Sequence, residues 1–109
     1  TVREFDGLAV SSRNAYLSPL ERKAAPVLFR ALTAVKLMWD SGERSGDALR
    51  FKLKSVLLDE SLAHTEYAAI VDTDTFQELD NFVGSARALL AVNIGRARLI
   101  DNLLLRKCD

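Results

Sequence analysis

The chain has 109 residues, the length of a single domain that can bury a hydrophobic core. Its 15 basic and 15 acidic residues balance, which argues against a broad nucleic-acid or anionic-membrane footprint. The single cysteine, Cys108, excludes an internal disulfide framework and a cysteine-based zinc site. No apolar run approaches the roughly 20 residues needed to span a bilayer. The single cysteine and the lack of a signal peptide favour a reducing, cytoplasmic compartment. Because the chain opens without methionine, we expect a piece of a longer protein.

The first 17 residues have no helical period. Asp6-Gly7 predicts a turn, and the apolar run Leu8–Val10 predicts a short strand or an extended segment. The polar run Ser11-Ser12-Arg13-Asn14 then predicts a loop.

Two helical stretches follow. Ser18 and Glu21 form a capping-box pattern around Pro19, which suits a first helical position. Pro26 is expected to kink this helix or to divide it in two, and Gly42 is expected to end it. A further helix is predicted from 45–47 to about 59–60. Apolar residues recur at helical spacing in both stretches: Leu28, Ala31, Leu32, Val35, Met38 and Trp39, then Leu49, Leu53, Val56 and Leu57.

From Thr65 the pattern changes to the alternation typical of a strand, which continues to Asp72. Residues 73–84 are predicted to be loop and irregular structure. The apolar run 86–94 predicts a central strand, and Gly95 predicts a turn into a third strand over 97–104. The expected fold class is α+β, with two to three helices packed on a small antiparallel sheet of about three strands.

Few side chains in the sequence suggest a catalytic or metal-binding role. His64 has no second histidine or cysteine near it, so a surface or capping role is favoured over a metal or acid–base role. Cys108 is interpreted as an incidental thiol. Asp72 and Asp74 are a candidate carboxylate pair, but aspartates at strand ends are typical of turns.

Asp101-Asn102 interrupts an apolar run. A polar pair inside a strand predicts a buried polar anchor for the hairpin or for an adjoining loop. Arg96 and Arg98, at the preceding turn, are the predicted partners.

The segment from Arg3 to Asn14 is the strongest candidate site. Hydroxyls, backbone N–H groups and a guanidinium in the 11–14 run suit phosphate oxygens. Taken alone, the same run favours a plain surface turn over a phosphate site. No Walker A or G-x-G-x-x-G pattern accompanies it.

The run VREFDGLAVSSRNAYL, residues 2–17, closely resembles the signature of the pantothenate synthetases (pantoate–β-alanine ligases). Three later stretches resemble that family in the same order: 18–26, 66–72 and 95–102. The resemblance covers nearly the whole chain.

This resemblance implies the C-terminal lid domain of a class I nucleotidyl-transferase-like ligase, spanning 1–109 as one domain. A larger N-terminal Rossmann-like domain, absent from this chain, would be its partner. The family uses ATP with Mg²⁺ to adenylate pantoate, and β-alanine then displaces AMP to give pantothenate, a precursor of coenzyme A. The full enzyme is expected to be a homodimer with no nucleic-acid or membrane partner.

Carried over by position, Val10, Ser11, Ser12 and Arg13 would form the ATP-binding loop, which resembles the K-M-S-K-S loop of class I aminoacyl-tRNA synthetases. Val2 would contact ATP through its backbone, and Arg13 would stabilise phosphate charge. Val10 departs from the family's usual Met or Leu.

With only one histidine, the chain cannot contain the family's H-x-G-H motif, which belongs to the N-terminal domain. That domain would also hold most of the Mg²⁺-ATP. The isolated chain is therefore predicted to be inactive.

Two other classes of function remain open. In a non-enzymatic α+β interaction module, the run from Ser11 to Asn14 would be only a turn. Nucleic-acid binding is disfavoured by the zero net charge. The lid interpretation requires this run to be exposed toward a docking surface, whereas the interaction module does not.

Overall fold

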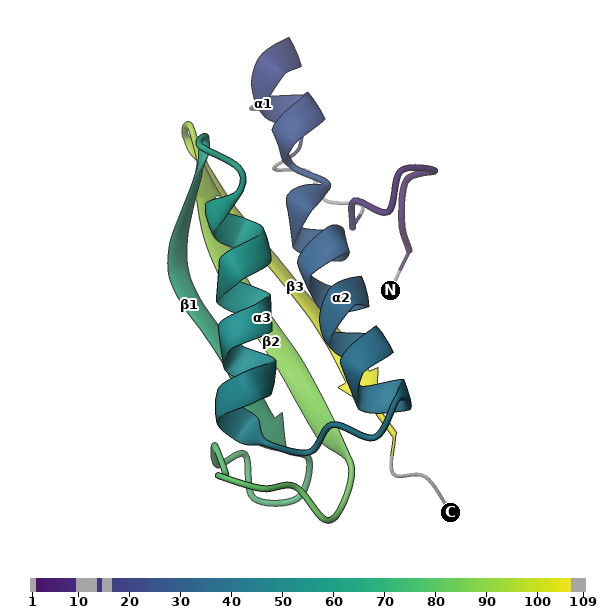
Figure 1. Cartoon of the computed structure of the whole chain (residues 1–109). Coiled ribbons are helices and arrows are strands. Elements are labelled where there is room, and N and C mark those ends of the chain that lie inside the picture. Colours follow the sequence, from purple (N-terminus) through teal and green to yellow (C-terminus); the bar gives the residue numbers. More distant parts are fainter. Residues whose placement is uncertain (1, 10–13, 15–16, 107–109) are drawn as a thin grey trace.

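The computed structural model describes residues 2–9, 14 and 17–106. Two long helices pack side by side on one face of a three-stranded antiparallel sheet, and a short helix precedes them (Figure 1). The elements in chain order are α1 (Pro19–Ala24), α2 (Val27–Asp40), α3 (Gly46–Leu58), β1 (Ala63–Asp72), β2 (Ala86–Ile94) and β3 (Ala97–Leu105). The predicted α+β class is confirmed.

Local capping signals define the helices as predicted. The Ser18 hydroxyl accepts from the backbone N–H of Glu21 at 3.2 Å, and the Glu21 carboxylate accepts from the backbone N–H of Ser18 at 2.8 Å. Pro26 separates α1 from α2, because proline cannot donate a helical hydrogen bond. Gly42, at φ 108°, follows α2 in a conformation that favours glycine.

The sheet has the order β1-β2-β3, so the predicted central strand is indeed central. A two-residue turn joins β2 to β3, and Gly95 adopts φ 60° within it. β1 begins at Ala63, two residues before the predicted start, so His64 lies inside the strand. The pairing of β1 with β2 shifts between Thr65 and Tyr67, where a bulge interrupts the regular register.

The hydrophobic core lies between the sheet and the two long helices. Alternate residues of β2 and β3 point into it, as do the apolar faces of α2 and α3. The largest fully buried side chains are Trp39, Leu28, Leu32, Leu49, Leu53, Leu57, Ile70, Leu90, Ile94, Leu105, Val27 and Val35. In the part of the chain that the structure describes, no helix is long and apolar enough to cross a membrane.

Trp39 ties α2 to the rest of the core. Its indole N–H donates to the carbonyl of Arg106 at 2.7 Å, beyond the end of β3. The Arg44 guanidinium lies 3.8 Å from the centre of its ring, and Phe82 makes an edge contact at 6.1 Å. Cation–π and edge contacts of this kind add to the stabilisation from burial alone.

Candidate functional site

The N-terminal segment folds back on itself beside α2. Arg3 and Ala9 form an antiparallel bridge, and the Gly7 N–H donates to the Glu4 carbonyl at 2.9 Å. This confirms the predicted turn at Asp6-Gly7. Gly7 has φ 94°, and a Cβ there would lie 2.1 Å from the ring of Phe29, so the turn packs closely on α2. Within the described residues, the run predicted as a short strand makes one bridge, at Ala9.

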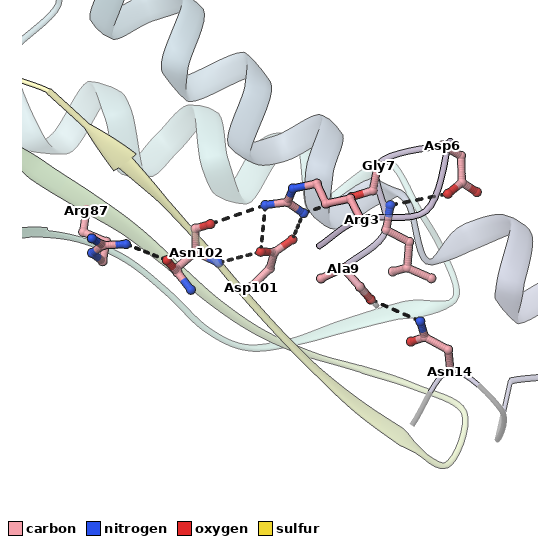
Figure 2. Close-up of polar contacts among 9 residues, drawn as sticks. Arg3, Asp6, Gly7, Ala9, Asn14, Arg87, Asp101 and Asn102 are labelled. Carbon is pink, nitrogen blue, oxygen red and sulfur yellow. Dashed lines mark hydrogen bonds and ion pairs between the residues drawn. The ribbon is translucent and has the colours of Figure 1, made fainter. Parts of the chain in front are cut away.

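Arg3 joins this segment to the last strand. Its guanidinium donates to both carboxylate oxygens of Asp101, at 2.6 and 3.0 Å, and to the Gly7 carbonyl at 2.9 Å (Figure 2). It also lies 4.7 Å from the centre of the Phe29 ring. A bidentate arginine–carboxylate pair is a strong, directional contact. The segment is therefore held against β3 at a defined orientation.

Asp101 is the buried polar anchor that the sequence predicts, with 4% of its surface exposed. The predicted partners, Arg96 and Arg98, are wrong. Successive side chains of a strand point to opposite faces, so Asp101 and Arg98 lie on opposite sides of the sheet. Arg98 instead donates to Glu66 across the exposed face, at 2.7 Å.

Sequence reasoning missed the role of Arg3, since no local pattern joins residues 98 positions apart. One signal was available. A buried carboxylate requires a cation or several donors, and Arg3 lies in the segment already singled out. Asn102 has a separate partner, because its side-chain oxygen accepts from Arg87 at 2.6 Å.

Asn14 holds the far end of the candidate loop. Its side-chain amide donates to the Ala9 carbonyl at 3.1 Å, so the two residues that flank 10–13 are joined (Figure 2). The side-chain oxygen of Asn14 is buried and has no hydrogen-bond partner among the described residues. Asn14 lines a small cavity of about 50 Å³ at the free edge of β3, together with Leu8, Ala9, Leu28 and residues 98–101.

The predicted ATP contacts fall in two groups. Val10, Ser11, Ser12 and Arg13 lie outside the described residues, between the placed residues Ala9 and Asn14. Val2 is described, lies next to Arg3 and is 76% exposed, so a ligand could reach it.

A second ion pair links the segment to α1. Arg22 donates to both carboxylate oxygens of Asp6, at 2.8 and 3.1 Å. These hydrogen bonds hold the pKa of the Asp6 carboxyl below its usual value. The N-terminal segment is thus attached at two places, to α1 and to β3.

We expect this pair to stabilise the fold in a pH-dependent way. Because the folded-state pKa of Asp6 lies below the unfolded one, its contribution is complete above about pH 4 and is lost as the pH falls through the folded-state pKa. An NMR pH titration of the side-chain carboxyl should give the lowered pKa directly. Arg22→Gln should return it toward the ordinary value, whereas Lys36→Gln, which breaks the exposed Lys36–Asp40 pair, should leave it unchanged. An Asp6 pKa insensitive to Arg22→Gln would contradict the assignment.

The remaining candidates have local structural roles. Asp72 accepts from the backbone N–H groups of Asp74 and Thr75, at 2.8 and 3.1 Å, which confirms the turn interpretation. His64 is exposed on β1, opposite Asn93. Cys108 lies outside the described residues. Residues 2–9, 14 and 17–106 contain no group of three His, Cys, Asp or Glu side chains that could hold a metal ion.

Comparisons with known proteins agree with this architecture. The family model described as Pantoate-beta-alanine ligase matches residues 1–104. The chain is 57% identical over 104 residues to a pantothenate synthetase of Roseiflexus castenholzii, covering 95% of this chain and 37% of that protein. It is 43% identical, again over 104 residues, to a pantothenate synthetase of Dehalococcoides mccartyi, of which it covers 39%.

A crystal structure of pantothenate synthetase from Thermus thermophilus superimposes with a TM-score of 0.88 at 45% identity, covering 94% of this chain and 37% of that one. The chain thus spans well under half the length of these relatives. With the family match extending over nearly all of its residues, the chain belongs to the pantoate-beta-alanine ligase family.

Proposed function

We propose that this chain acts as the C-terminal lid domain of a pantoate–β-alanine ligase and supplies a loop, residues 10–13, that contacts the phosphates of ATP. The observation that carries the proposal is the family match, which includes the signature run 2–17. The attachment of this run to β3 through Arg3 and Asp101 supports it, since a phosphate-binding loop needs a rigid support. An N-terminal Rossmann-like domain, as the rest of the ligase, would carry the pantoate site and the dimer contacts.

The proposed reaction has two steps. The pantoate carboxylate attacks the α-phosphorus of ATP, which forms the acyl adenylate and releases pyrophosphate. The amine of β-alanine then attacks the acyl carbon, and AMP leaves with the carboxylate oxygen. Negative charge grows on the departing pyrophosphate in the first step, so hydrogen-bond donors already in place there lower the barrier.

The donors assigned to this loop are the hydroxyls of Ser11 and Ser12 and the guanidinium of Arg13, with main-chain contacts from Val10 and Val2. Arg3 is not a candidate for this role, because its guanidinium is already bonded to Asp101 and Gly7. Closure of the lid would also exclude water from the hydrolysable acyl adenylate.

Mg²⁺ accompanies ATP in this reaction class. The described residues do not fit it, because they offer no group of three acidic, histidine or cysteine side chains. We therefore assign Mg²⁺ no ligand in this part of the chain.

The test joins residues 1–109 to the N-terminal part of the Roseiflexus castenholzii relative, which is 57% identical over the region replaced. We refer to this protein as the chimeric ligase. It should form pantothenate from pantoate, β-alanine and Mg-ATP, whereas residues 1–109 alone should form none. The unmodified relative is the positive control. A folded chimeric ligase without activity would contradict the proposal.

A further inference from the structure

We propose that Arg3, Asp101 and Asn14 form a loop anchor, a set of positioning residues that fixes Ala9 and Asn14, the residues on either side of the candidate ATP loop 10–13. The inference rests on the proposed function, because it assigns a task to the residues around that loop. None of the three is proposed to touch ATP. Each acts by holding the residues between which the loop begins and ends.

The first step is the fixed point on the sheet. The Asp101 carboxylate is buried and accepts three donors: the two nitrogens of Arg3 and the backbone N–H of Asn102, at 2.8 Å. A buried carboxylate with this many charge-assisted bonds is costly to displace. Arg3 is thereby held to β3, which pairs with β2 in regular register along its other edge.

The second step links Arg3 to Ala9, the residue before the loop. Arg3 bonds the Gly7 carbonyl through its side chain, and its backbone forms the bridge with Ala9. Ala9 is the last described residue before the loop. Its position is therefore set by the same residue that Asp101 holds (Figure 2).

The third step concerns Asn14, the residue after the loop. Asn14 donates to the carbonyl of Ala9, so the residues before and after 10–13 are joined by a hydrogen bond. The side-chain oxygen of Asn14 is buried, and Asn14 lines a cavity together with Leu8, Leu28 and the 98–101 stretch of β3. An amide held this way fixes the separation between Ala9 and Asn14.

The functional consequence concerns ATP alone. Displacing a catalytic group by about 1 Å can cost about a hundredfold in rate, so a loop with loosened ends should lose contact with the phosphates. Pyrophosphate has left before β-alanine attacks. Loss of the anchor should therefore lower kcat/KM for ATP and leave kcat/KM for β-alanine unchanged.

The experiment uses the chimeric ligase with Asn14→Ala and with Asp101→Asn, which keeps the side-chain shape but removes the charge. Glu66→Gln is the matched control, because it breaks the Arg98–Glu66 pair on the exposed face of the same sheet. The anchor variants should lower kcat/KM for ATP about tenfold, equivalent to about 1.4 kcal/mol. Their kcat/KM for β-alanine, and both constants of the control, should stay within about twofold.

If the three residues only stabilise the fold, the two anchor variants should unfold at a lower temperature but keep the kcat/KM for ATP of Glu66→Gln. That result would overturn the proposal. Should Asp101→Asn fail to fold, Asn14→Ala decides, since Asn14 lies outside the α-helices and strands. Arg13→Ala distinguishes failure of the loop anchor from failure of the proposed ATP loop. If it lowers kcat/KM for ATP while the anchor variants do not, only the anchor is wrong. If it has no effect, the ATP loop itself fails, and the anchor with it.

Discussion

Arg13→Ala in the chimeric ligase is expected to slow pantoate adenylation by roughly 10²–10³-fold, the usual effect of removing one donor that faces developing negative charge. The guanidinium matches two phosphate oxygens at once, so Arg13→Lys should recover only part of the loss. The rate of pyrophosphate release in a single turnover, at saturating Mg-ATP and pantoate, measures this step without the later attack by β-alanine.

Arg30→Ala is the control for this prediction. Arg30 is exposed on α2, and its replacement removes the same charge from the same domain. It should leave the rate of pyrophosphate release within about twofold, as expected for an exposed charge at physiological ionic strength. Equal rates in the two variants would show that Arg13 has no special contact with the phosphates.

Trp39→Ala should remove about 3–5 kcal/mol from the free energy of unfolding, the usual cost of deleting a large core side chain. Trp39 is 1% exposed, and the change also leaves the Arg106 carbonyl and the Arg44 guanidinium without their contacts. Since domains of this size have about 5–15 kcal/mol of stability, the variant should be barely folded. Urea denaturation followed by far-UV circular dichroism measures the difference.

Leu37→Ala provides the comparison on the same helix. Leu37 is 65% exposed, so its truncation should change the unfolding free energy by no more than about 0.5 kcal/mol. Trp39→Phe keeps much of the buried ring but loses the indole N–H, and its loss should lie between the other two. A Trp39→Ala loss as small as that of Leu37→Ala would mean that α2 is not held to the sheet through this side chain.

The helices and strands of this chain could be predicted because their signals are local. Ser18 and Glu21 lie within one helical turn, and the glycines at 42 and 95 adopt the positive φ values that favour glycine. The apolar segment 86–94 forms the central strand, as predicted, and β2 pairs with a neighbour along each edge. The start of β1 was placed two residues too late, since its exposed first residues show no alternation of burial.

The candidate site was only partly predictable, and the division has a physical cause. The signature run 2–17, the buried character of Asp101 and the turn at Gly7 were determined by the sequence alone, because each depends on residue type and near neighbours. The partner of Asp101 was decided only by the tertiary structure. A strand alternates its side chains between two faces, and only folding determines which segment covers the inner one.

The same holds for the loop anchor. The sequence placed Asn14 at the end of a polar run, but the fold brought it to the carbonyl of Ala9 and to a cavity beside β3. Arg3 and Asp101 meet across nearly the whole chain, and such contacts form only when helices and sheet have packed. The sequence thus determined the residue types. Their long-range pairing, which positions the ends of the loop, was determined by the packing of the N-terminal segment on α2 and β3.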